Sequence, residues 1–133
     1  MYALLSALFA ALTAILAKVG VRNIDSDLAT GVRTVVILVL VWTIVIAKGA
    51  TKFASITKQN FLFLFLSGLA TGASWLFYFK ALQVGNVSQV APVDKLSIAL
   101  TLILSVVFLH ESLSLKTAVG AAMIIAGVLL VIN

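Results

Sequence analysis

The chain has 133 residues, of which 63% are hydrophobic and only 10% are charged, and its net charge is +5. A soluble domain carries about 25% charged residues, so lipid must solvate most of this surface. The basic residues stand singly between apolar runs, which is typical of membrane edges, and we therefore expect no nucleic-acid partner. With no cysteine, one histidine and four acids, the chain has few metal ligands, and we expect neither a metal site nor another cofactor.

Five apolar stretches are long enough to cross a bilayer, which takes about 20 residues. They are too long and too continuous for barrel strands, so an all-α fold is predicted. The first stretch lacks the basic leader of a signal peptide, and we expect it to be a retained span. Ser114 and Thr57 are predicted to cap the last and third helices. The predicted fold is an all-α integral membrane protein of the prokaryotic inner membrane. It forms one domain over residues 1–133, with helices over residues 2–20, 28–47, 61–82, 87–109 and 115–132.

Five spans place the two termini on opposite sides of the membrane. Side A holds the N-terminus and the second and fourth loops, and side B holds the first and third loops and the C-terminus. Bases divide almost evenly between the sides, so the positive-inside rule gives almost no preference. Either the chain inserts in both orientations, or a neighbouring segment or one dominant loop fixes one. Side A carries Lys48, Lys52, Lys58 and Lys116; side B carries Lys18, Arg22 and Lys80, with Arg33 inside the second span.

The fourth predicted helix carries an ionisable pair, Asp94 and Lys95, well inside an apolar span, where charge is costly and usually functional. Pro92 removes one backbone N–H and frees the carbonyl of Ser88, so it predicts a helix break. Broken helices at membrane depth are tolerated where they line a cavity, and many transporters bind substrate at such half-helix ends.

Polar side chains form one stripe on the third helix and one on the fourth, with a spacing that puts each stripe on one helix face. Facing stripes would line a wet cavity, whereas Ser and Thr also join membrane helices by hydrogen bonds. The presence of Asp94 favours the cavity. The stripes are Ser67, Thr71, Ser74 and Tyr78 on the third helix, and Asp94, Ser97, Thr101 and Ser105 on the fourth.

Helix rise places four ionisable residues at similar depths from side B. Lys80 or Arg33 is the expected partner of Asp94, because Asp94 and its neighbour Lys95 project about 100° apart on a helix. Three bases against one acid favour an anionic or zwitterionic small-molecule substrate; the alternative is an ion pair that only stabilises the fold. Lys18 is expected to snorkel. The predicted substrate-binding residues are Arg33, Ser74, Trp75, Tyr78, Lys80, Asp94, Lys95 and Ser97.

Two glycine pairs predict close helix packing. Gly68 and Gly72 form a GxxxG motif, and Gly120 and Gly127 lie one heptad apart. The sequence contains no nucleophile–base pair and no metal-ligand spacing, so we do not expect an enzyme.

Several features mark the last three helices: the runs FKALQVGNVS at 79–88, VAP at 90–92 and FLHE at 108–111, followed by Gly120 and Gly127. Together they resemble an EamA-type domain, the repeat unit of the drug/metabolite transporter superfamily. Full-length members have ten helices, built as two five-helix repeats of opposite orientation, and most move small metabolites. The resemblance implies half of that ten-helix inverted-repeat fold. An antiparallel homodimer or a paired half-transporter would then supply the second half.

The leading interpretation is a half-size secondary transporter that moves a small polar metabolite by alternating access as a dimer. A second is a subunit of a lipid-linked-sugar flippase, because short relatives of the family serve there. A third is a non-transporting membrane assembly protein, which would tolerate substitution of Asp94, Lys95 and Arg33. A small-multidrug-type antiporter is disfavoured, because those relatives carry an essential acid in the first helix and residues 2–17 contain none.

Overall fold

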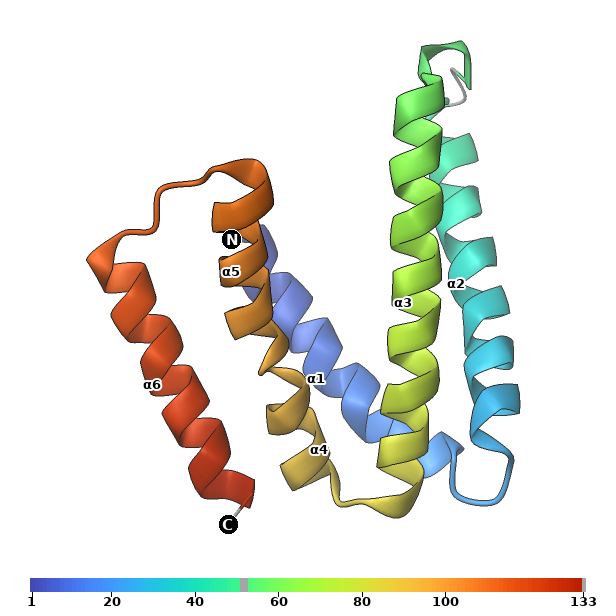
Figure 1. Ribbon diagram of the computed structural model, residues 1–133. Coiled ribbons are helices and arrows are strands. Elements are labelled where there is room, and N and C mark those ends of the chain that lie inside the picture. Colours follow the sequence, from blue (N-terminus) through green and yellow to red (C-terminus); the bar gives the residue numbers. More distant parts are fainter. Residues whose placement is uncertain (51–52, 133) are drawn as a thin grey trace. The chain divides into compact units, whose positions relative to one another are not determined.

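The computed structural model describes residues 1–50 and 53–132, so Lys52, which the sequence places on side A, lies outside the described residues. The described residues form helices and connecting turns (Figure 1). The α-helices are α1 (Tyr2–Gly20), α2 (Ser26–Ala47), α3 (Lys58–Val84), α4 (Val87–Asp94), α5 (Ser97–Leu109) and α6 (Leu115–Ile132), and a short 3-10 helix covers Phe53–Ser55.

Five helical segments are long and apolar enough to cross a membrane, as the sequence predicted. Four of them are single helices, and the fifth is α4 together with α5, over Val87–Leu109. Helices α1 and α6 begin and end where the sequence placed them. Helix α2 begins at Ser26 rather than at residue 28, and α3 covers Lys58–Val84 rather than 61–82.

Side-chain caps explain where three helices begin. The carboxylate of Asp25 accepts from the backbone N–H groups of Asp27 and Leu28, at 2.9 and 3.1 Å, and so starts α2 earlier than predicted. The Thr57 hydroxyl accepts from the backbone N–H of Asn60 at 3.1 Å. The Ser114 hydroxyl accepts from the backbone N–H of Thr117, also at 3.1 Å. The predicted caps of α3 and α6 are therefore confirmed, whereas the Asp25 cap was not predicted.

The end of α2 is a Schellman turn built on Gly49. Its backbone lies in the left-handed region, with φ of 62°, which glycine adopts without a Cβ penalty. The Gly49 N–H donates to the Ile46 carbonyl at 2.9 Å, and the Ala50 N–H donates to the Val45 carbonyl at 3.0 Å. The turn satisfies two carbonyls at the end of α2 and stops the helix there.

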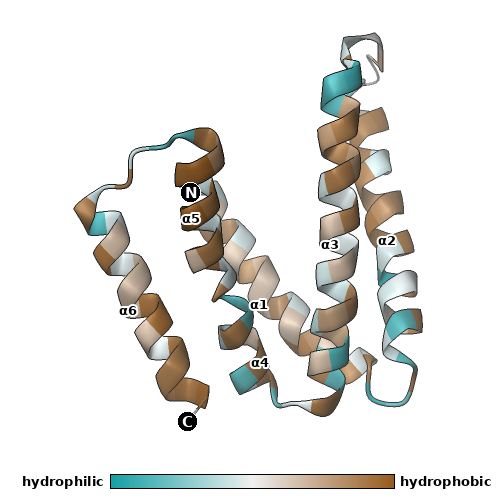
Figure 2. Ribbon diagram, in the orientation of Figure 1, coloured by the Kyte–Doolittle hydropathy of each residue, from teal (hydrophilic) through white to brown (hydrophobic). Residues whose placement is uncertain are grey.

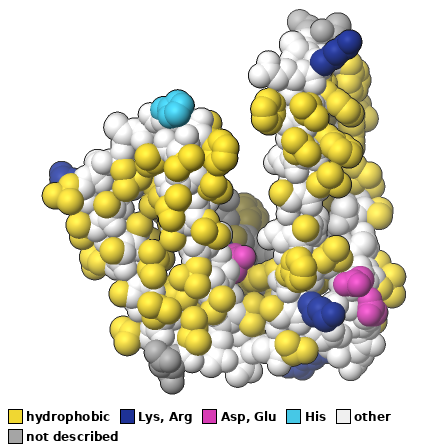
Figure 3. Space-filling model, viewed as in Figure 1, with side chains coloured by type: hydrophobic (Ala, Val, Ile, Leu, Met, Phe, Trp, Pro, Cys, Tyr) yellow, Lys and Arg dark blue, Asp and Glu magenta, His cyan; other side chains and the backbone are white. Residues whose placement is uncertain are grey.

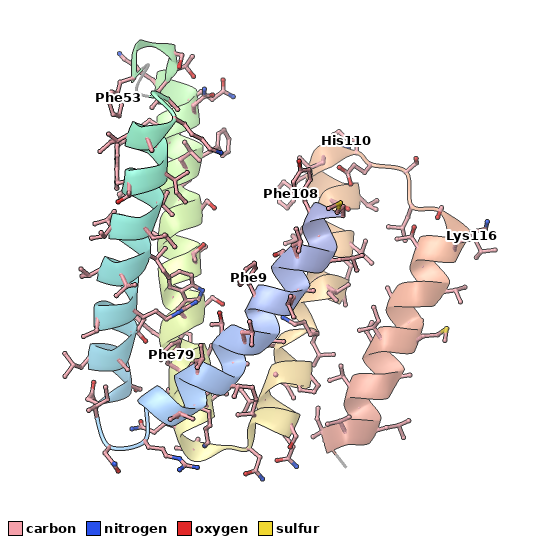
Figure 4. The ribbon with its side chains drawn as sticks, turned by 180° about the vertical axis from the view of Figure 1, so that it is seen from behind. Phe9, Phe53, Phe79, Phe108, His110 and Lys116 are labelled. Carbon is pink, nitrogen blue, oxygen red and sulfur yellow. The ribbon has the colours of Figure 1, made fainter. Side chains whose placement is uncertain are left out.

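The chain divides into two compact units. One unit, Ile15–Val84, holds the end of α1 and the antiparallel hairpin of α2 and α3 (Figure 1). Phe53 lies at the loop end of this hairpin and Phe79 toward its other end (Figure 4). A small core of Val21, Ala29 and Phe79 joins the three helices at that second end.

The other unit comprises Met1–Ala14 and Gly85–Asn133, of which residues 1–14 and 85–132 are described. Within it, α6 packs against both α4 and α5. His110 ends α5 in the left-handed conformation, with φ of 54°, and its backbone N–H donates to the Ser105 carbonyl.

Apolar side chains cover the outside of both units. Hydrophobic residues follow the length of each span, and hydrophilic residues gather near helix ends, in the loops and along α4 (Figure 2). Figure 3 shows hydrophobic side chains over most of the visible surface. At most 11% of the residues of any span are buried inside the chain. Lipid solvates such surfaces, and the protein is therefore a multi-pass integral membrane protein.

Candidate functional site

Arg33 lies against two aromatic rings of the neighbouring helix. Its guanidinium carbon is 4.2 Å from the centroid of the Trp75 ring and 5.3 Å from that of Phe79. Trp75 and Phe79 are four residues apart on α3, so both rings are on the face that packs toward α2. A cation over an aromatic face is attracted by the ring quadrupole, by about 2 kcal/mol when desolvated. The aromatic pair therefore offsets part of the cost of holding Arg33 inside a span.

The other predicted residues of α3 surround this contact to different degrees. Tyr78 is half-buried and packs against the small core. Ser74 and Lys80 are exposed. The sequence also offers Phe79, together with Trp75 and Tyr78, as an aromatic residue that could pack against substrate. In the structure Phe79 is 3% exposed and belongs to the small core.

The fourth span is interrupted between α4 and α5. Pro92 lies inside α4, and the helix ends at Asp94, so the interruption falls at Lys95 and Leu96, after the proline rather than at it. The N–H of Lys95 donates to the Pro92 carbonyl at 2.9 Å, and the N–H of Leu96 donates to the Val93 carbonyl at 3.0 Å. These bonds reach back three residues instead of four, as in a 3-10 turn.

The 3-10 pattern continues into α5, where the N–H groups of Ile98 and Ala99 donate to the carbonyls of Lys95 and Leu96 at 3.0 Å. The tighter turn follows the loss of the Pro92 N–H, which leaves the Ser88 carbonyl without its helical donor. The predicted helix break is therefore present, one turn further along the chain than Pro92.

Asp94 and Lys95 form an ion pair at this break. The Lys95 Nζ is 3.0 Å from the Asp94 Oδ2. The sequence predicted Lys80 or Arg33 as the partner of Asp94, but the structure pairs it with its neighbour in the chain. The long Lys95 side chain spans the angular offset that separates adjacent residues at a helix end. Both side chains are partly accessible, 36% for Asp94 and 52% for Lys95.

The hydroxyl groups of the two polar stripes bond within their own helices where the structure gives them a partner. The Thr71 hydroxyl donates to the Ser67 carbonyl at 2.9 Å, and the Ser105 hydroxyl donates to the Leu102 carbonyl at 3.0 Å. Such back-bonding satisfies a hydroxyl without a second helix. Ser97 is exposed at the first position of α5. The stripes lie in different units, and their common cavity stays a prediction.

Lys18 has a definite structural partner instead of the snorkelling position that the sequence predicted. Its ammonium donates to the Leu82 carbonyl at 2.5 Å and to the Gln83 carbonyl at 3.5 Å. These carbonyls belong to the last turn of α3, which has no helical donors left and attracts a cation. The Gln83 amide donates in turn to the Ile24 carbonyl at 2.9 Å. The hydrogen bonds of Lys18 and Gln83 therefore connect α1 and the loop after it to the end of α3.

The predicted packing glycines have open space beside them. A Cβ placed on Gly68, Gly72, Gly120 or Gly127 meets nothing within 4 Å among the described residues. These positions therefore do not mediate a close helix approach inside their own unit. Their role in packing against a second chain stays a prediction.

Across residues 1–50 and 53–132, no three His, Cys, Asp or Glu side chains gather in a way that could hold a metal ion.

Five apolar spans, one of them interrupted at an ion pair, define a polytopic α-helical membrane protein with charged residues inside its spans. The chain belongs to the EamA-like transporter family, which matches it over residues 1–133, and this confirms the predicted resemblance. It is 57% identical over 130 residues to a Sinorhizobium protein named "uncharacterized transporter in cobO 3′ region", a match that covers 97% of this chain and 92% of that protein. It is 34% identical over 76 residues to an uncharacterized protein of Methanocaldococcus jannaschii, covering 56% of each chain. No solved structure matches the chain.

Proposed function

We propose that this EamA-like transporter is a half-size secondary transporter that moves a small anionic or zwitterionic metabolite by alternating access. Two five-helix chains of opposite orientation, as an antiparallel homodimer or a paired half-transporter, make the complete transporter. The observation that carries the proposal is the Asp94–Lys95 ion pair at the interruption between α4 and α5.

Charged residues inside a span cost free energy of insertion, and a role in transport would explain why this span carries them at its interruption. A single charged residue at the centre of a membrane helix costs about 2.5–3.5 kcal/mol on insertion scales. Asp94 lies roughly 10 Å along the helix from Val87, by a rise of 1.5 Å per residue, which is well inside the span. Charges at such depth mark substrate or ion pathways, and a 3-10 turn inside a helix is often a hinge. Two half-helices joined by a hinge can adopt the two arrangements that alternating access needs.

The charge balance supports an anionic or zwitterionic substrate. Asp94 and Lys95 neutralise each other as a pair. Residues 28–84 contain Arg33 and Lys80 inside helices α2 and α3 but no Asp or Glu at all. A substrate that brings its own negative charge supplies the counter-ion that this part of the chain lacks.

The dimer is supported by the size of a relative and by the outer surface of the described helices. This chain covers 92% of the Sinorhizobium relative, so that relative has room for about one five-helix repeat. Large apolar side chains on every span face outward, for example Leu100 and Met123, which are 63% and 71% exposed. The open space beside Gly120 and Gly127 leaves room for a helix of a second chain.

The proposal is tested with purified protein and two assays. A thermal-shift screen against small carboxylates, amino acids and phosphates first identifies compounds that bind. Counterflow of each hit is then measured in proteoliposomes for the wild type, Asp94→Asn, Lys95→Met and the matched loop control Lys116→Met. We expect transport by the wild type and Lys116→Met and its loss in the other two. Absence of counterflow for every hit, or movement of a lipid-linked sugar instead, would refute the proposal.

A further inference from the structure

Arg33 is a permanent charge without an acidic neighbour along its helix pair. Arginine is not deprotonated in proteins, so the charge inside α2 cannot be removed by burial. No Asp or Glu occurs between Leu28 and Val84. Asp25, just before α2, already accepts two backbone N–H groups as the helix cap. Asp27, in the first turn of α2, lies six positions before Arg33 and so does not form an i, i+3 or i, i+4 pair with it. The hairpin of α2 and α3 therefore holds a cation with no carboxylate at a pairing position on its own helix.

The aromatic contact holds this cation in one orientation. A guanidinium that lies over a ring contacts it with its flat face, while its N–H donors lie in the guanidinium plane and point outward from the edge. The guanidinium carbon lies over the Trp75 ring, 4.2 Å from its centroid. The Phe79 ring is buried in the core, with its centroid 5.3 Å from the same carbon. Arg33 itself is only half-buried, so part of the residue is accessible.

We propose that Arg33 binds the carboxylate of the transported metabolite through two parallel hydrogen bonds, with Trp75 holding the guanidinium in place. The substrate class is a small carboxylic acid or amino acid with an apolar body, because the rings of Trp75 and Phe79 lie beside the guanidinium. The inference rests on the proposed transport function and names its substrate class. A paired guanidinium and carboxylate make charge-assisted, geometrically specific bonds, which a lysine cannot reproduce.

The chain provides its own reporter for this site. It contains two tryptophans, Trp42 and Trp75. Trp42 stacks on Phe53, with ring centroids 6.0 Å apart, and Phe53 marks the loop end of the hairpin, away from Phe79 (Figure 4). In a Trp42→Phe protein, fluorescence therefore reports on the ring that touches Arg33. Arg22, the only other arginine and exposed in the loop after α1, is the matched control.

The experiment titrates the Trp42→Phe protein in maltoside micelles with 4-methylpentanoate, leucine and the neutral 4-methylpentanamide. We expect a saturable fluorescence change with the acid and with leucine, and none with the amide. Arg33→Gln should raise the Kd about 10- to 100-fold, because hydrogen bonds to a charged group are lost. Arg22→Gln should leave the Kd unchanged. Arg33→Lys, which keeps the charge, should also raise the Kd, and it decides the question if Arg33→Gln does not fold.

Three results would overturn the inference: an equal response to the amide, a wild-type Kd in Arg33→Lys, or an Arg33-dependent response to phosphatidylglycerol but to neither carboxylate. The last result would identify an anionic lipid headgroup as the ligand. Binding in micelles needs no transport, so the two proposals fail separately. If the wild type shows counterflow and Arg33→Gln binds the carboxylates with an unchanged Kd, only the inference about Arg33 is refuted. If binding depends on Arg33 but the wild type shows no counterflow, only the proposed transport function is refuted.

Discussion

The Nζ of Lys95 lies 3.0 Å from the Oδ2 of Asp94, at the point where α4 ends and the chain turns before α5. Lys95 occupies the C-cap position of α4, and the partial negative charge of a helix C-terminus favours a cation there. Asp94 neutralises the same ammonium. In the proposed alternating-access mechanism, a change of angle between α4 and α5 would alter the surroundings of both charges.

Removal of either charge of this pair should stop transport with little effect on the fold. Both side chains are more than one-third exposed, and exposed ion pairs contribute about 0–1 kcal/mol to stability. We expect Asp94→Asn and Lys95→Met each to lose both counterflow and proton-driven uptake, because each leaves a charge unpaired at the hinge. The double variant Asp94→Asn with Lys95→Met should keep the thermal stability of the wild type without regaining transport. Wild-type counterflow in both single variants would place the pair outside the transport site.

Replacement of Pro92 by alanine should stabilise the chain and slow transport. The alanine restores a backbone N–H that can donate to the Ser88 carbonyl, and a proline inside a helix costs about 3 kcal/mol. A continuous fourth helix loses its hinge, so we expect a higher midpoint of thermal unfolding in detergent and a reduced counterflow rate. Val93→Ala, a neighbouring change that leaves the backbone donors intact, is the control. A counterflow rate in Pro92→Ala equal to that of the wild type would mean that the interruption does not move.

Substitution of Lys18 by methionine should weaken the unit formed by residues 15–84 without removing a substrate contact. The change removes a charged donor to the Leu82 and Gln83 carbonyls, and hydrogen bonds to charged groups contribute about 1.5–3 kcal/mol. Thermal unfolding in detergent should shift downward, while Lys116→Met should not shift it. The Kd for 4-methylpentanoate should stay the same below the unfolding temperature. Wild-type thermal stability of Lys18→Met would show that Lys18 does not stabilise the C-terminal end of α3.

Added lysines should fix the orientation in which the chain inserts into the membrane, so that transport can be measured for each orientation alone. Asn23→Lys with Asn86→Lys adds two bases to side B, and Ala50→Lys with Ser112→Lys adds two to side A. Reporter fusions at the C-terminus should show opposite orientations for the two proteins. We expect each protein alone to lose counterflow and co-expression of both to restore it, because an antiparallel dimer needs one chain of each orientation. The Asn23→Gln, Asn86→Gln protein controls for loop changes.

Full counterflow by either oriented protein alone would contradict the antiparallel dimer. It would leave the single-chain site at Arg33 untouched, since that site is built from α2 and α3 of one chain.

The sequence by itself determined the number of the spans and their approximate limits. The thickness of the hydrocarbon core fixes the length of an apolar run, and a backbone in lipid must bond internally, so composition and length suffice. The caps at Ser114 and Thr57 could also be predicted from the sequence, because a cap bonds to residues only two or three positions away. The interruption near Pro92 was predictable for the same reason, although the turn falls at Lys95 and Leu96.

Only the tertiary structure decided which polar groups meet. Arg33 and Trp75 belong to different helices, and their contact depends on the rotation and register of α2 against α3, which no local pattern specifies. Lys18 and Leu82 meet for a similar reason, 64 positions apart. The pairing of Asp94 with Lys95 shows the same limit at short range. A helix periodicity gives the direction of a Cβ, whereas the flexible stem of a lysine decides where its charge comes to rest.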